Sequence, residues 1–381
     1  MKTRVKTRVL TLAAFAASAV AAQAGGLDRS DQPIGVIFET GNHIDLSFGF
    51  SVPSVDGTDL ATTAAIDNVA DDFLLWSGAI KYEVTDKLSF ALIIDEPYGS
   101  DVTYPGNPAF TSLGGTSAVV DSFAATAVAR YKFDDNWSVH GGLRYQEISA
   151  NIALGGGAYG PLSGYNAAFA SGGEVGYLVG FAYEIPTIAL RIALTYNSEI
   201  THDLDTVETG VPLLGTVTDV TTITAPESLN LSFQTGVAKD TLLFGSVRYA
   251  RYSDTIVSPT GFDTIVGPGT AGDSLSDLED TTDFEIGIGR RFSDKWSGSL
   301  AVGFESEGTD SLVSPLAPTN GATYLALGAK YDVNESFSIS GGIRYTDLGD
   351  AFAETGTPDV ARGDFNGNDA VSVGIRFGYK F

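Results

Sequence analysis

The stretch Ala370–Phe381 (AVSVGIRFGYKF) decides the fold, because its apolar and polar side chains alternate without a break. One face carries only large apolar side chains, namely Val371, Val373, Ile375, Phe377, Tyr379 and Phe381. Alternation with a period of two indicates a β-strand that has different surroundings on its two faces. The other face carries Arg376, Lys380 and small residues, which suits a barrel lumen better than the surface of a soluble sandwich.

The sequence predicts that the chain crosses a membrane as a barrel. No run of 18 apolar residues follows residue 24, so no membrane-spanning helix is expected. In lipid, every backbone polar group needs a partner within the protein, and a closed β-barrel is the other structure that provides one. The chain ends on Phe381, which resembles the aromatic C-terminal signal read by the barrel-assembly machinery, so we expect that machinery to be a partner.

Residues 1–24 have the pattern of a signal peptide. Four basic residues lie within the first eight positions, and an alanine-rich apolar run covers residues 9–22. Ala22-Gln23-Ala24 is a small-x-small cleavage site, so Gly25 is the expected first residue of the exported chain. Export together with a barrel indicates the outer membrane of a Gram-negative cell, with lipid and lipopolysaccharide as neighbours.

Composition argues against several functions. Lys and Arg number 22 against 47 Asp and Glu, and this acidity would repel a nucleic acid. The chain has no cysteine, so thiol chemistry is excluded. Its histidines are His43, His140 and His202, and none lies in a recognisable nucleophile or metal-ligand motif. We therefore expect no enzyme activity, no metal and no cofactor.

A repeated turn organises the chain. The segment Lys81–Phe90 recurs at Arg130–Val139 and at Lys330–Ile339, with a shorter copy at Arg291–Ser297. Each copy reads as a strand, a short polar turn and a second strand, with aromatic residues beside the turn as at a membrane interface. Two more short connections, near 184–187 and 239–240, complete six tight hairpins.

These hairpins predict an all-β fold, a transmembrane antiparallel barrel of about fourteen strands. The expected strands are 43–52, 73–84, 88–96, 122–133, 137–148, 177–184, 188–197, 229–238, 241–252, 284–292, 296–305, 324–331, 337–346 and 370–381. The long connections are 53–72, 97–121, 149–176, 198–228, 253–283, 306–323 and 347–369. Acids in them, such as those of 273–280, indicate a solvated surface or divalent-cation bridges to lipopolysaccharide.

Two groups of side chains are candidates for binding a solute. Arg144, Arg248 and Arg344 each precede a tyrosine near a strand end and are expected to face the lumen. They either pair with lumenal acids or grip an anionic head group. The long connections carry apolar residues, Leu154, Tyr159, Leu162, Tyr165 and Phe169, then Leu213 and Leu214. These either pack on each other as a cap or form a surface that captures an apolar ligand.

Pro97, Tyr98 and Gly99 interrupt the third strand. Proline cannot donate to a ladder and glycine weakens one, so this element either opens a gap in the wall or begins the next loop. An apolar solute that leaves through a wall gap enters the bilayer directly.

The chain resembles the FadL/TodX family of long-chain fatty-acid and hydrocarbon transporters. It has fourteen expected strands after a short N-terminal segment, and Gln32-Pro33-Ile34 lies where the family usually has Asn-Pro-Ala. The exit from the first strand, Phe50–Gly57, is family-like, and Asp95–Gly99 is similar to the family's Pro-Phe-Gly element. Only about eight residues precede Pro33, fewer than in the best-known members.

The resemblance implies three segments: a leader at 1–24, a lumenal hatch at 25–42 and a barrel at 43–381. It implies that Leu27, Arg29, Pro33 and Ile34 belong to the hatch and that Pro97, Tyr98 and Gly99 form a lateral opening. A monomer that carries hydrophobic compounds, most simply long-chain fatty acids, is then expected. The alternatives are an aromatic hydrocarbon channel, a general porin, which would favour a wider barrel, and an outer-membrane lipase or protease.

Overall fold

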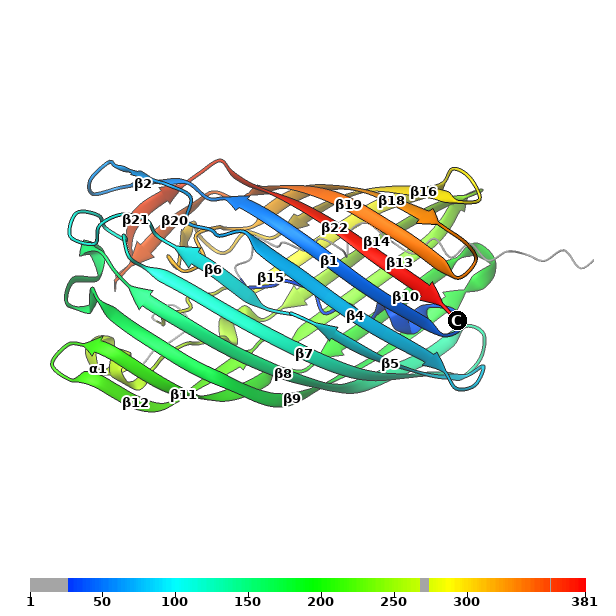
Figure 1. Ribbon diagram of the computed structural model, residues 1–381, viewed down its shortest axis with the longest axis horizontal. Coiled ribbons are helices and arrows are strands. Elements are labelled where there is room, and N and C mark those ends of the chain that lie inside the picture. The colour runs from blue at the N-terminus through cyan, green and yellow to red at the C-terminus, as the bar shows by residue number, and fades with distance from the viewer. Residues whose placement is uncertain (1–26, 268–273, 357) are drawn as a thin grey trace, which may run out of the picture.

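The computed structural model describes residues 27–267, 274–356 and 358–381, and the expected leader lies outside them. The chain forms a closed antiparallel barrel of fourteen tilted strands (Figure 1), as predicted. The barrel strands are β1 (His43–Ser54), β4 (Phe73–Glu83), β5 (Leu88–Asp95) continued by β6 (Gly99–Thr103), β7 (Ser117–Lys132), β8 (Trp137–Leu154), β9 (Tyr165–Ile185), β10 (Leu190–Asn197) continued by β11 (Ile200–Val211), β12 (Gly215–Ala225) continued by β13 (Ser228–Ala238), β14 (Thr241–Ala250), β15 (Thr281–Arg291), β16 (Trp296–Glu305), β18 (Ala322–Asp332), β19 (Phe337–Leu348) and β22 (Asn368–Lys380).

The last strand closes the barrel against the first. β22 pairs with β19 on one side and with β1 on the other, in a register that sets His43 opposite Lys380. Val371, Val373 and Ile375 are 39–46% exposed on its outer face, whereas Ser372 is 1% exposed on its inner face. The apolar face therefore points outward, as expected for a strand in contact with lipid.

The repeated turns share one capping device. Asp134 accepts hydrogen bonds from the backbone N–H groups of Asn136 and Trp137, and Asn334 does the same for Ser336 and Phe337. The hydroxyl groups of Thr85 and Ser293 accept the equivalent pairs of bonds in the other two copies. A short polar side chain at this position satisfies the turn's N–H groups locally. We call this rim the turn end and the opposite rim the loop end.

Several predicted loops are wrong, because strands continue beyond the expected membrane band. β8 extends to Leu154 and β9 begins at Tyr165, so most of the expected loop 149–176 is strand. The expected loop 198–228 is the β11–β12 hairpin, and β6 with the start of β7 occupies part of 97–121. The alternation continues outside the membrane with polar outward residues, which weakened the contrast used to end each strand.

Short elements gather at the loop end (Figure 1). A second, five-stranded sheet joins β17 (Leu312–Val313), β20 (Ala351–Thr355), β21 (Val360–Phe365), β2 (Gly57–Asp59) and β3 (Ala65–Ile66).

The helices are η1 (Gly35–Phe38), η2 (Gly157–Leu162), η3 (Pro186–Ile188), η4 (Tyr252–Asp254) and α1 (Thr260–Val266). In the part of the chain that the structure describes, no helix is long and apolar enough to span a membrane.

Candidate functional site: the hatch and the wall beside it

Residues 27–42, which we call the hatch, run inside the barrel before β1. Their helix η1 buries Val36, Ile37 and Phe38 against lumenal side chains of β5, β7, β9 and β10. The Phe38 ring contacts the guanidinium groups of Arg130 and Arg191, whose central carbons are 4.6 Å and 4.7 Å from its centroid. Together with the apolar packing, these cation–π contacts hold the η1 part of the hatch in place. Of the predicted hatch residues, Ile34 packs against this cluster.

A buried ion pair holds the N-terminal part of the hatch against β14. Arg248 on β14 donates from Nε and Nη2 to Oδ2 of Asp28, at 3.0 Å and 2.6 Å. The Tyr252 hydroxyl donates to the same carboxylate oxygen at 3.1 Å, and Asp28 is 5% exposed. A buried carboxylate needs a cation or hydrogen-bond donors to offset its lost hydration, and Asp28 has both. Asp28 was not predicted, because a single acid in a short polar segment carries no pattern.

The wall beside the hatch is interrupted, and we call this interruption the wall gap. β4 pairs with β5 only from Gly78 to Glu83, so residues 73–77 of β4 have no ladder on that side. β5 ends at Asp95, β6 begins at Gly99, and β6 pairs with β7. Pro97 therefore lies between two strands of the wall and does more than begin a loop.

The hatch supplies backbone partners at the wall gap. Arg29 N–H donates to the Pro97 carbonyl, and Gly99 N–H donates to the Leu27 carbonyl, each at 2.9 Å. The Trp76 indole N–H bridges the gap to Glu96 Oε1 at 2.9 Å. A Cβ atom at position 99 would lie 2.9 Å from Arg29 Nε, so glycine at this position lets the hatch approach.

Arg29 and Tyr98 link the hatch to the gap through their side chains. The Arg29 guanidinium carbon lies 3.3 Å from the Phe73 ring centroid, and its Nε donates to the Gly99 carbonyl at 2.9 Å. Burial lowers the pKa of Arg29 to about 10, while Asp101, Glu96 and Asp121 act in the opposite direction, so the group stays charged at neutral pH. The Tyr98 hydroxyl accepts a bond from Gln32 Nε2 at 2.9 Å.

The structure separates the three predicted lumenal arginines. All three are buried, at 2–4% exposure. Arg248 is engaged with Asp28, and Arg344 lies 4.0 Å from Glu285 and 4.0 Å from the Tyr324 ring centroid. Arg144 donates from Nε to the Thr126 hydroxyl at 2.9 Å, and no described carboxylate oxygen lies within 4.0 Å of its side-chain nitrogens. Two of the three thus follow the ion-pair interpretation.

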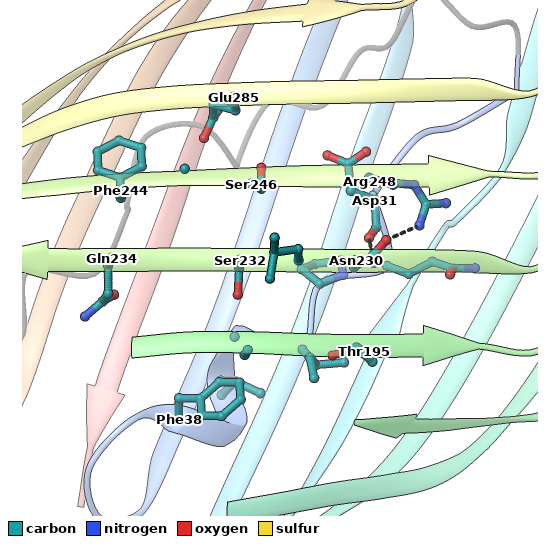
Figure 2. Close-up of a pocket in the computed structure, with 18 of the residues that line it drawn as sticks. Asp31, Phe38, Thr195, Asn230, Ser232, Gln234, Phe244, Ser246, Arg248 and Glu285 are labelled. Atoms are coloured by element: carbon teal, nitrogen blue, oxygen red, sulfur yellow. Dashed lines mark hydrogen bonds between the residues drawn. The ribbon is translucent and has the colours of Figure 1, made fainter. Parts of the chain in front are cut away.

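A cavity of about 290 Å³ remains in the lumen beside the hatch (Figure 2). Asp31 and Phe38 of the hatch line it together with polar side chains of β13 and β14, such as Asn230, Ser232 and Ser246. Acids and arginines both border it, including Glu285 and Arg344. Its volume lies near the lower limit of about 300 Å³ for small-molecule pockets.

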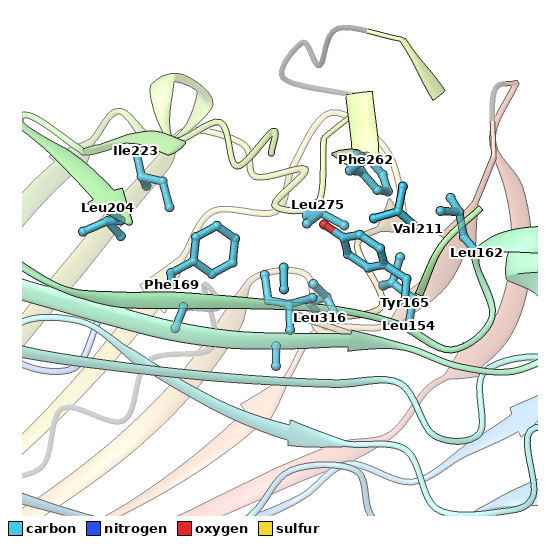
Figure 3. Close-up of a cluster of buried hydrophobic side chains, with 14 residues drawn as sticks. Leu154, Leu162, Tyr165, Phe169, Leu204, Val211, Ile223, Phe262, Leu275 and Leu316 are labelled. Carbon is cyan, nitrogen blue, oxygen red and sulfur yellow. The ribbon is translucent and has the colours of Figure 1, made fainter. Parts of the chain in front are cut away.

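Most of the predicted capture residues meet in one apolar group, which we call the outer cluster (Figure 3). Leu154, Leu162, Tyr165 and Phe169 are each at most 8% exposed, and Tyr159 packs against them. Phe262 of α1, Leu275 and Leu316 contribute from other connections. Leu213 is fully exposed and Leu214 is 51% exposed at the β11–β12 turn, so these two do not join the cluster.

Glu208 fixes α1 beside this cluster, and sequence reasoning missed it. Its carboxylate accepts bonds from the backbone N–H groups of Gly261 and Phe262 and from the Tyr165 hydroxyl, each at 2.7 Å. A carboxylate at the first turn of a helix satisfies otherwise unpaired N–H groups. The only sequence signal is an acid on the inward side of an alternating segment within the expected loop 198–228.

The histidines form local structural contacts. His43 bonds to Asp45, His140 to Thr195, and His202 to Gln146 and the Gly172 carbonyl. Across residues 27–267, 274–356 and 358–381, no three His, Asp or Glu side chains are placed to hold a metal ion.

Comparison with known proteins places this architecture. A family profile described as "Outer membrane protein transport protein (OMPP1/FadL/TodX)" matches residues 26–381. The fold is similar to a Pseudomonas aeruginosa FadL homologue, with a TM-score of 0.71 and 14% identity over 92% of each chain. It is also similar to the toluene transporter TodX of P. putida, with a TM-score of 0.63 and 12% identity over 90% of this chain and 91% of TodX.

The toluene transporter TbuX of Ralstonia pickettii gives a TM-score of 0.61 and 14% identity over 90% of each chain. A sequence comparison with curated proteins found no match. At these identities the solved structures support the fold, and the matching profile supports the family.

Proposed function

The chain belongs to the OMPP1/FadL/TodX family of outer-membrane transport proteins, and we propose that it carries long-chain fatty acids by lateral release through the wall gap. One observation carries this proposal: hatch backbone groups occupy hydrogen-bonding positions at the gap. When the hatch withdraws, Pro97 and Gly99 lose these partners and the wall beside Tyr98 is free to open. An apolar solute then enters the bilayer without crossing lumenal water.

The proposed route begins at the loop end. In barrels of this kind short turns face the periplasm, which sets the outer cluster on the outside of the cell. Its apolar residues form the capture surface once their contacts with Phe262, Leu275 and Leu316 open. A second apolar group, the middle cluster, then leads past Ile148 and Tyr252 to Tyr98 at the gap. The protein acts as a monomer, and Phe381 addresses it to the assembly machinery.

Arg144 is the residue we assign to the fatty-acid head group. Its guanidinium is not held by an ion pair within the described chain, in contrast to Arg248 and Arg344. It lies on β8 opposite Gly176 of β9, on the inner face of the wall. A charge-assisted bond to a carboxylate contributes about 1.5–3 kcal/mol, and each buried methylene adds about 0.8 kcal/mol. Affinity should therefore rise with chain length and fall in Arg144→Gln.

Neutral hydrocarbons are the second candidate, because the ion pairs of Arg248 and Arg344 leave only Arg144 of the three predicted arginines for head-group binding. A binding series with the purified protein separates the two classes. It compares long-chain fatty acids with alkanes and monoaromatic compounds of matched apolar area, in the wild type, Arg144→Gln and the control Arg344→Gln.

We expect Arg144→Gln to weaken acid binding about tenfold or more and to leave alkane binding unchanged. Equal binding of acids and neutral compounds, unaffected by Arg144→Gln, indicates a hydrocarbon channel. Free passage of small hydrophilic solutes without binding of either class indicates a porin and overturns the proposal.

A further inference from the structure

The barrel wall has a second interruption, which we call the seam. β9 pairs with β10 from Leu178 to Ile185 and with β11 from Asn166 to Phe169. Between these ladders, residues 170–176 of β9 lie opposite residues 199–205, of which 200–205 belong to β11, and the structure shows no ladder pairs between these two segments. On its other side, β11 is paired with β12 without a break from Ile200 to Glu208. The ladder is therefore missing on one side of β11 only, and β11 itself is not frayed.

Glycines of β9 make room for side chains of β11 in the seam. A Cβ atom at Gly176 would lie 2.5 Å from Ile200 Cγ1, and one at Gly172 would lie 2.6 Å from Leu204 Cδ2. Ile200 and Leu204 therefore fill space over the glycine backbone. His202, between them in sequence, contacts the Gly172 carbonyl and Gln146 Oε1 at 3.1 Å each. Side chains thus replace the ladder, and side chains move more readily than backbone.

The seam faces the apolar interior at two levels. Ile200 belongs to the middle cluster, with Ile148, Tyr98 and Tyr252. Leu204 belongs to the outer cluster, with Ile152 and Phe169. Moving these two side chains would therefore connect the outside of the wall with both clusters, and through the middle cluster with Tyr98 at the wall gap.

The outer side of the seam lies at the edge of the band of apolar, outward-facing residues that surrounds the barrel. Val175 and Tyr177 of β9 are 61% and 52% exposed, whereas the outward residues Thr201 and Asp203 of β11 are polar. The Tyr145 hydroxyl lies over the backbone of Gly173, where a Cβ atom would be 2.1 Å away. Tyrosines at the end of such a belt mark the membrane interface. The seam therefore opens where the barrel surface changes from apolar to polar.

We propose that the seam is a lateral inlet, through which hydrophobic compounds held at the outer-membrane interface reach the two apolar clusters. The inference rests on the proposed transport function and adds a second place where a hydrophobic compound can enter the barrel. It gives compounds access to the outer cluster, whose residues, Phe262, Leu275 and Leu316 among them, are buried against one another. The inlet takes molecules that are apolar and narrow enough to pass when Ile200 and Leu204 rotate.

A reversible cross-link tests the inlet. A Cβ atom at Gly176 would lie 2.8 Å from Ser198 Oγ, so cysteines at 176 and 198 are within reach of a disulfide, whose Cβ atoms are about 4 Å apart. The double variant Gly176→Cys with Ser198→Cys is expressed in cells that lack their own channel of this family. Uptake of radiolabelled oleate and toluene is measured before and after reduction.

The controls are Gly176→Cys alone, which places the same Cβ atom against Ile200, and the pair Phe181→Cys with Leu194→Cys, which joins ladder partners on β9 and β10. We expect the oxidised seam variant to take up the probe about threefold more slowly than the same protein after reduction, as for a gated step. Both controls should be insensitive to reduction. Because oxidised and reduced samples are one folded protein, a folding defect cannot produce the difference.

The inlet is overturned if the oxidised seam variant takes up the probes as fast as the same protein after reduction. The variant Pro97→Val, at the wall gap, is measured in parallel to keep the two proposals apart. A seam effect without a Pro97→Val effect contradicts lateral release and retains the inlet. The reverse result retains lateral release and excludes the inlet.

Discussion

The wall gap and the seam interrupt one barrel, but different parts of the chain fill them. At the wall gap, the Leu27 carbonyl and Arg29 N–H come from the hatch, a segment remote from the wall strands in sequence. At the seam, Ile200, Leu204 and His202 come from β11 itself. Opening the first requires a segment to leave, with its buried Asp28–Arg248 pair. Opening the second requires only side chains of the strand to rotate, so the two openings should respond to different mutations.

The largest effect is expected from removing the hatch contacts. Deletion of residues 25–31 eliminates Asp28, Arg29 and the backbone bonds at the wall gap. Ion conductance in planar bilayers should rise, because residues 27–31 occupy the lumen, while protease sensitivity at the seam should stay unchanged. Wild-type conductance after deletion would show that the hatch does not plug the barrel.

A smaller but clear effect is expected from Arg248→Ala. This change leaves Asp28 buried without its cation, at a cost of about 3–5 kcal/mol, so the hatch should undock and conductance should rise. The double change Asp28→Asn with Arg248→Gln removes both charges and should restore much of the docking. Hatch position is measured by labelling a cysteine introduced at Ser30. Equal labelling of the single and double variants would contradict a charge-based anchor.

Trimming the seam should alter uptake and spare the hatch. Ile200→Ala with Leu204→Ala removes the side chains that cover Gly176 and Gly172, so uptake of oleate should rise about twofold to threefold with conductance unchanged. Ile148→Ala with Ile152→Ala is the matched control, since it removes equivalent groups from the same two clusters on β8. Each large-to-small change costs about 2–5 kcal/mol, so both variants are checked for heat-modifiable gel mobility. The same rise in both variants would assign the effect to lost packing.

The smallest effect is expected from Pro97→Val. Valine restores an N–H group to the interrupted strand and favours the extended conformation, which should slow oleate uptake about twofold. Folding should be intact, because Arg29 still has the residue 97 carbonyl as its acceptor. Unchanged uptake, with the hatch still docked, would count against release at this position.

The sequence by itself determined the barrel. Alternation in β22, the repeated turns and the strand count follow from local chemistry, because each strand has one face toward lipid and each turn has its own capping side chain. The break at Pro97 was also predictable, since proline lacks an N–H group in any context. The inward direction of Arg144, Arg248 and Arg344 followed from the same period of two.

Only the tertiary structure decided which partners these residues have. Asp28 and Arg248 are 220 positions apart, and nothing local to either indicates that a hatch residue neutralises that arginine. The seam was likewise not predicted. β11 keeps a regular alternation and residues 170–175 of β9 do not, but neither pattern reports which bonds between the two strands are missing. The predicted loop bounds were the least accurate. β8 and β9 continue past the membrane, where polar outward residues resemble those of a loop. Alternation reports the surroundings of a side chain, whereas pairing between distant strands depends on how the closed barrel brings them together.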